Sequence, residues 1–183
     1  MADTQRTVAA VLALLADNTA GAISPQDLRD AFVSWRNGHG ELSISAANRA
    51  AVTIAGTVNY YEVTNPVWTL SSDAYLFDES GGNGRLTYTG TVAIAVRVHC
   101  TVSVTSGSNS QVLHLRLGKS GTTIAESESQ DKLGIGADVR NVSCAALVHL
   151  TTGQYLSLWI RNETGANNVT IECANLSLLG IAQ

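Results

Sequence analysis

Charged residues are scarce in this chain. Only 14% of its 183 residues are Asp, Glu, Lys or Arg, against roughly 25% in a typical soluble domain. The formal net charge is -4 and the basic residues are scattered, so no basic patch exists to hold a phosphate backbone, and we expect no nucleic-acid partner. The remaining polar surface of Ser, Thr, Asn and Gly costs little to desolvate. That property favours broad contact with identical copies or with a scaffold.

Cysteine and long hydrophobic runs are also scarce. Cys100, Cys144 and Cys173 cannot all pair within one chain, and no secretory signal argues for an oxidising compartment. Each lies among apolar or β-branched neighbours, so we expect three reduced, buried thiols that pack as small hydrophobic side chains. The longest apolar run near the start, residues 8–16, is about half a membrane span. With acidic as well as basic residues before it, this run predicts neither membrane insertion nor a signal peptide.

Catalytic and metal-binding motifs are missing. The histidines do not have the spacing of a metal site, and no GxSxG motif marks a serine nucleophile. The LGKSG string around Lys119 lacks the first glycine and the following helix of a phosphate-binding loop, so it predicts a hairpin turn. Oxygen ligands flank the glycine-rich loop ESGGNG, but their spacing matches no EF-hand, and we expect a solvated loop there. We therefore predict a non-enzymatic protein without a cofactor or metal. The histidines are His39, His99, His114 and His149, and the oxygen ligands are Asp73, Asp78, Glu79 and Asn83.

The first 40 residues predict a helical anchor. A first helix within residues 4–18 and a second beginning after Ser24 each place apolar side chains at helical spacing. Ser24 is a good N-cap, Pro25 fits the first helical position, and Asp27 completes a capping-box pattern. Helices this short are marginal alone, so we expect them to attach to another protein. A helix-turn-helix is disfavoured, because Asp27 and Asp30 would face phosphates. The candidate attachment residues are Val8, Val11, Leu12, Leu15, Leu28, Phe32 and Trp35.

Residues 41–183 predict an antiparallel β-sandwich, with residues 36–41 as the boundary segment. In residues 91–104, apolar and polar side chains alternate strictly, which is typical of an antiparallel strand with one face in the core. Shorter alternating segments separated by turn signals follow, and a change of phase near the end predicts a β-bulge at Ala174 and Asn175. The pattern predicts a mainly β chain with a jelly-roll sandwich. Arg97 and His99, on the non-core side, are candidates for a trimer axis or an exposed polar face.

Two segments resemble known virion proteins. VAAVLALL (residues 8–15) followed by AISPQDLRDAFVS (22–34) resembles the short leader of bacteriophage fibres and head-associated proteins. GRLTYTGT (84–91) and the segment from GQYLSLWI to LSLLGI (153–181) resemble a compact trimeric jelly roll of the tumour-necrosis-factor-like or complement type. The resemblance implies a homotrimer whose leader attaches to another virion component.

Two functions follow from this layout. The first is a trimeric head decoration or cement protein on the capsid surface, docked on the major capsid protein and made in the bacterial cytoplasm. The alternative is a receptor-binding tail fibre or tail tip that recognises a host glycan or protein. In that case Tyr88 or Trp159 could stack on a sugar if exposed, although alternation within YLSLWI favours a core position for Trp159. Copy number per virion separates the two functions.

Overall fold

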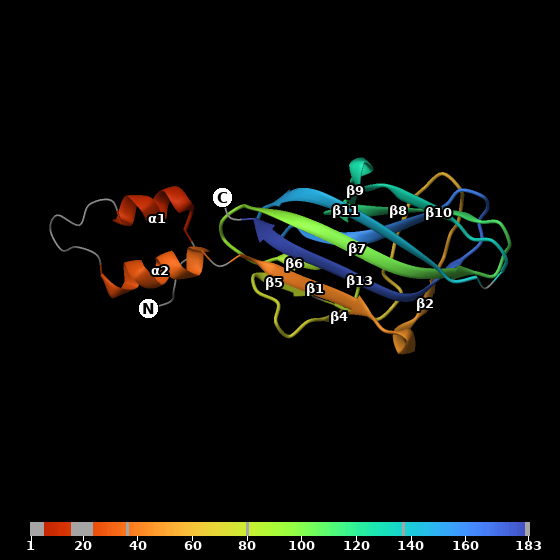
Figure 1. Ribbon diagram of the computed structural model, residues 1–183, viewed down its shortest axis with the longest axis horizontal. Helices are drawn as coiled ribbons and strands as arrows, with labels where there is room; N and C mark the ends of the chain where they lie inside the picture. The colour runs from red at the N-terminus through yellow and green to blue at the C-terminus, as the bar shows by residue number, and fades with distance from the viewer. Residues whose placement is uncertain (1–5, 16–23, 36, 80, 137, 182–183) are drawn as a thin grey trace.

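The computed structural model is a two-layer β-sandwich with a pair of short helices at one end (Figure 1). The structure describes residues 6–15, 24–35, 37–79, 81–136 and 138–181. The helices are α1 (Val8–Leu15) and α2 (Pro25–Trp35). The sandwich then begins at β1 (His39–Ile44). These elements confirm the predicted mainly β, antiparallel jelly-roll sandwich with a two-helix N-terminus.

Two antiparallel sheets form the sandwich. In sheet A the strand order is β11-β7-β13-β1-β4, with β2 paired to β13, so the first and last strands of the sandwich are neighbours. In sheet B the order is β10-β8-β12-β6-β5, with β3 paired to β12 and β9 to β8. Besides β1, sheet A holds β2 (Ala50–Val52), β4 (Thr69–Leu70), β7 (Ile94–Ser106), β11 (Arg140–Leu150) and β13 (Val169–Ile181). Sheet B holds β3 (Tyr61–Glu62), β5 (Phe77–Glu79), β6 (Leu86–Tyr88), β8 (Val112–Lys119), β9 (Thr122–Thr123), β10 (Ser129–Lys132) and β12 (Tyr155–Asn162). Two short 3-10 helices, η1 (Ala46–Asn48) and η2 (Ala125–Ser127), lie in connecting segments.

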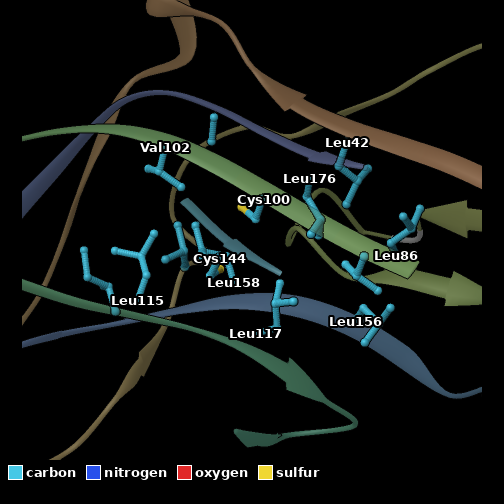
Figure 2. Close-up of a cluster of buried hydrophobic side chains, with 14 of the residues drawn as sticks. Leu42, Leu86, Cys100, Val102, Leu115, Leu117, Cys144, Leu156, Leu158 and Leu176 are labelled. Atoms are coloured by element: carbon cyan, nitrogen blue, oxygen red, sulfur yellow. The ribbon is translucent and has the colours of Figure 1, made fainter. Parts of the chain in front are cut away.

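The core lies between the inner faces of the two sheets (Figure 2). The alternation predicted for residues 91–104 appears in β7, where Val96, Val98 and Cys100 are buried and the residues between them are exposed. Strands β8 and β12 supply the opposite layer with Leu113, Leu115, Leu117, Leu156, Leu158 and Ile160, all fully buried. Removing one of these leucines would leave a cavity, which typically costs about 2–5 kcal/mol.

The cysteines divide into a buried pair and an exposed residue. Cys100 and Cys144 lie opposite each other on β7 and β11, inside the core. The hydrogen bond with Cys144, together with complete burial, raises the pKa of the Cys100 thiol, which keeps it unreactive. The prediction of three buried thiols was wrong for Cys173, which is exposed.

A β-bulge in β13 explains the exposed thiol. The pairing with β7 shifts between Ile171 and Cys173, so Glu172 is the extra residue. The Glu172 carboxylate accepts a hydrogen bond from Thr105 (2.7 Å) and contacts Arg49 (3.3 Å), so it stays on the outer face. Cys173 therefore also points outward, and Ala174 turns inward. The bulge was predicted slightly too far along the chain, at Ala174 and Asn175.

The segment predicted as a boundary contains the start of a strand. Residues 36–41 were interpreted as a helix breaker because of their two glycines, but β1 begins at His39 and includes Gly40. A Cβ at Gly40 would lie 3.0 Å from the Cβ of Phe77 and 3.2 Å from a methyl of Leu86. The glycine thus lets β1 pass close to the core rather than ending an element. The division into residues 1–40 and 41–183 stays a prediction.

The two helices pack on each other through a small interface. Val11 and Ala31 are buried, and so is Asp30, whose carboxylate accepts hydrogen bonds from Arg6 (3.0 Å) and Gln26 (2.7 Å). The predicted capping box is present. Ser24 Oγ accepts the backbone N–H of Asp27 (3.2 Å), and the carboxylate of Asp27 accepts the N–H of Ser24 (2.9 Å). In the described part of the chain, neither helix is long and apolar enough to cross a membrane.

Candidate interaction surfaces

The outer face of sheet A carries an apolar band at the end nearest the helices. Leu147, Arg97, Leu179 and His39 lie in register across β11, β7, β13 and β1. Leu147 and Leu179 are 62% and 57% exposed, and Ile181 further along β13 is 44% exposed. We call Leu147, Leu179 and Ile181 the leucine band. Leu147 and Leu179 lie on either side of Arg97, and Leu179 and Ile181 share the outer face of β13, so this part of the sheet is a candidate interaction surface.

Arg97 and His99, the two polar candidates from the sequence, both lie on this face. They alternate with the buried residues of β7 and are exposed, as predicted. Arg97 lies between Leu147 and Leu179, and no carboxylate of the described residues forms an ion pair with it. A guanidinium between two leucines needs an acceptor from another molecule if this face becomes covered. A position of these two residues at a trimer axis stays a prediction.

The next two rows of this face combine small side chains with a few longer polar ones. The row after the leucine band holds Ala145, His99, Ser177 and Glu41, and the next holds Ser143, Thr101, Asn175 and Ser43. Two of the longer polar side chains are hydrogen bonded to each other, because the Asn175 amide donates to Glu41 (2.8 Å). Such a surface loses little solvation when another surface covers it.

The helices expose a second apolar surface. Leu12, Leu28 and Phe32 are exposed, whereas Val11 faces the partner helix. The side chains of Val8, Leu15 and Trp35 lie outside the described part of the chain. The exposed side chains suit the predicted attachment role, which stays a prediction.

The outer face of sheet B carries a dense charged network instead. His114 on β8 contacts Glu128 through Nδ1 (2.6 Å) and Glu163 through Nε2 (2.5 Å), although only 5% of its side chain is exposed. Arg116 also contacts Glu128, and Arg161 lies 3.5 Å from Glu163. Both ring nitrogens of His114 therefore contact carboxyl groups that come from different loops. We call these five residues the His114 cluster.

Tyr60 closes the His114 cluster on one side. The guanidinium carbons of Arg116 and Arg161 lie 4.4 and 5.2 Å from the centre of its ring, within cation–π range. Burial raises the pKa of Tyr60 to about 12. The hydrogen bond from Arg116 lowers the pKa of Glu128 to about 2. The Glu128 carboxylate and the Arg116 guanidinium therefore stabilise each other's charged forms.

The His114 cluster was not predicted from the sequence. His114 and Arg116 fall in the outer phase of VLHLRL, which is a usable signal. Their carboxylate partners come from separate loops, 14 and 49 residues away from His114. No local spacing connects these residues, so only the fold brings them together.

Trp159 also lies on the outer face of sheet B, not in the core. Leu156, Leu158 and Ile160 occupy the inward phase of β12, which leaves Trp159 facing out and partly exposed. The expected core position was therefore wrong. Tyr88, the other residue considered for sugar stacking, is fully buried, and its hydroxyl donates to the carbonyl of Val92 (2.5 Å).

The carboxylates beside the glycine-rich loop accept hydrogen bonds from backbone N–H groups nearby in the chain. Glu79 accepts the N–H of Gly84 (3.2 Å), and Asp78 accepts the N–H of Glu79 (2.8 Å). Within the described residues, no group of three or more His, Cys, Asp or Glu side chains has the arrangement of a metal site. The contacts of Glu79 and Asp78 order the backbone of this turn.

Comparisons with known proteins identify the fold. The structure of Eiger TNF from S. frugiperda is similar with a TM-score of 0.50 and 14% sequence identity, over 80% of this chain and 94% of that chain. The crystal structure of murine APRIL at pH 5.0 is similar with a TM-score of 0.52 and 11% identity, over 78% of this chain and 99% of that chain. No family model and no curated protein matches the sequence. The sandwich therefore has the TNF-like jelly-roll fold.

Proposed function

We propose that the chain is a non-enzymatic homotrimer that associates through the outer face of sheet A. The observation that carries this proposal is the leucine band, where exposed leucines on β11 and β13 flank an arginine without a carboxylate partner among the described residues. Covering apolar surface contributes roughly 25 cal/mol per Å², and the small side chains beyond the band allow close approach of a second copy. The threefold arrangement is the one that the resemblance to TNF-like trimers implies.

A pair of substitutions within the leucine band tests this association. The double variant Leu147→Asp, Leu179→Asp introduces two carboxylates where association would bury them, so we expect monomers by sedimentation equilibrium. Val58→Asp is the matched control, because Val58 is 78% exposed in a loop away from sheet A. The association proposal is wrong if the double variant keeps the mass of the wild type while remaining folded.

We propose further that this trimer is a bacteriophage head decoration or cement protein. Its short helices would dock on the major capsid protein through Leu12, Leu28 and Phe32, the exposed apolar side chains of the anchor. The leader-like sequence and the direct junction between α2 and β1 support this layout. Virions complemented with the variant Leu12→Asp, Phe32→Asp should lack the protein, although the purified variant still forms trimers. Normal attachment of that variant would refute the anchor assignment.

A receptor-binding tail protein is the second candidate. The partly exposed Trp159 on the outer face of sheet B favours it, because decoration alone requires no aromatic side chain there. Counting copies in purified virions separates the two: hundreds per particle support decoration, and a few to a few dozen support a fibre or tail tip.

A further inference from the structure

We propose that the outer face of sheet B binds a neutral pyranose sugar, with the indole of Trp159 as the stacking platform. The proposal does not depend on trimer formation, because all residues involved come from one copy. It gives the chain a binding function that a purely structural role does not need.

Trp159 is seated by a glycine on the neighbouring strand. A Cβ at Gly118 would lie 2.1 Å from Nε1 and 2.5 Å from Cδ1 of the indole, so only glycine allows the ring to rest there. Nε1 donates to Ser157 Oγ (2.9 Å), which fixes the ring orientation and leaves no unmet donor. The indole remains partly exposed. Its position is thus fixed before any ligand arrives, which reduces the entropy cost of binding.

Charged side chains flank the indole on both sides. In the register of sheet B, Trp159 pairs with Arg116 on β8 and with Glu62 on β3. Glu62 is itself held by Arg85 through two hydrogen bonds, 3.0 and 2.7 Å. Burial opposes ionisation of Glu62, but the hydrogen bonds from Arg85 and Ser157 outweigh it and lower its pKa. The row therefore places a guanidinium, an aromatic ring and a carboxylate in sequence, with Arg116 already donating to Glu128 and Glu62 already accepting from Arg85.

This row matches the chemistry of a sugar. A pyranose ring offers an apolar C–H face for the indole and a rim of hydroxyls that both donate and accept hydrogen bonds. A carboxylate has more acceptor sites, and a guanidinium more N–H donors, than these internal contacts use, and the remaining ones suit such a rim. The rings of Tyr155 and Tyr60 already lie against Arg85 and Arg116, with guanidinium carbons 4.7 and 4.4 Å from the ring centres.

Trp159 differs from these tyrosines. Among the described residues, no guanidinium lies over its ring. The indole is therefore a partly exposed aromatic ring on this face that no guanidinium of the described residues covers. A nucleic acid suits it poorly, because the net charge is -4 and the nearest carboxylate would repel phosphates.

Nitrogen-15 NMR of the full chain tests the proposal. The probes are disaccharides of glucose, galactose, mannose and N-acetylglucosamine, each titrated to millimolar concentration. We expect at least one to shift the indole N–H signal of Trp159 saturably. The signal of Trp68 should stay in place, because its Nε1 donates to the Val63 carbonyl inside the core.

Two variants separate binding from structural support. Glu62→Gln leaves the indole in place and should weaken binding about 10-fold or more, because hydrogen bonds to charged groups are worth about 1.5–3 kcal/mol. Trp159→Ala should abolish binding. The Leu147→Asp, Leu179→Asp variant should keep the affinity per chain, so loss of the trimer and loss of sugar binding are distinguishable.

Three results would overturn the proposal. One is that no disaccharide shifts the Trp159 signal. Another is that Glu62→Gln and Trp159→Ala both bind the sugar as tightly as the wild type. The last is that sulfated sugars bind while neutral ones do not. In each case Trp159 would serve only to cover Gly118 on the sheet, a known stabilising role for aromatic side chains.

Discussion

The two outer faces of the sandwich differ in whether their charged side chains have partners within the same copy. Sheet A presents small side chains and the leucine band, with Arg97 lacking a carboxylate partner in the described chain. Sheet B presents the His114 cluster, in which each charge already has its partner within the copy. The charges of the His114 cluster therefore need no second copy, although Tyr60 Oη, Ser129 Oγ and Arg161 Nε on this side have no hydrogen-bond partner among the described residues. Sheet A instead exposes apolar side chains around a guanidinium without a carboxylate partner, and this contrast is why we assign association to sheet A.

The largest expected effect comes from placing the same charge on each face in turn. Ala145→Arg puts a long cation beside His99, on the edge strand β11 of sheet A. Gln130→Arg puts it on β10 of sheet B, opposite His114. We expect Ala145→Arg to raise the dissociation constant of the trimer by orders of magnitude and Gln130→Arg to leave it unchanged. Sedimentation equilibrium measures both constants. Equal behaviour of the two variants would remove the distinction between the faces.

Histidine substitutions compare the faces by stability. The Gln side chain has one nitrogen where the imidazole has two, so His114→Gln cannot keep both contacts with Glu128 and Glu163, and we expect the free energy of unfolding to fall by about 1–3 kcal/mol. His99→Gln changes an exposed residue of sheet A and should stay within about 0.5 kcal/mol of the wild type. Urea denaturation under conditions that keep both proteins monomeric provides the measurement. An equal loss for both variants would show that the His114 cluster stabilises the fold no more than an exposed histidine does.

Acid should weaken the His114 cluster on the outer face of sheet B. The pKa of Glu128 is lowered from 4.5 to about 2, so its contribution to stability is fully present above its unfolded pKa. It is lost as the pH falls from about 4.5 to about 2. Glu128 is 30% exposed, and water screens part of this effect. We therefore expect Glu128→Gln to flatten the stability profile in that window, whereas Glu172→Gln on sheet A retains it; thermal unfolding against pH measures both.

The smallest effect is expected in the helices, outside both faces. Ser24→Ala removes the hydroxyl of the capping box, a change that typically costs about 1 kcal/mol. Hydrogen exchange should become faster in α2 and stay unchanged in β7 and β12. If exchange in the sandwich changed as much as in α2, the helices and the sandwich would be one cooperative unit.

Sequence periodicity predicted the layers and the helix start well. The alternation in β7 and the Ser24 capping box depend on neighbours in the chain, so the sequence contains their signals. β1 was missed because Gly40 is required by Phe77 and Leu86, which are distant in sequence. Cys173 was placed inside the core because the bulge depends on Glu172 meeting Thr105 and Arg49 across the sheet.

The candidate sites were predicted less completely than the fold. Arg97 and His99 were recognised because their phase on β7 opposes the core residues. The His114 cluster and the seat of Trp159 on Gly118 arise from pairing between strands β8 and β12 and from distant loops. Contacts of this kind follow from topology, and a single sequence does not contain them.

The mass of the intact wild-type chain in solution tests the central claim most directly. Sedimentation equilibrium at micromolar concentration should give three times the chain mass of 19.2 kDa, with the leucine band protected from solvent in hydrogen exchange. A stable species of 19.2 kDa with Leu147 and Leu179 fully exposed would contradict the account.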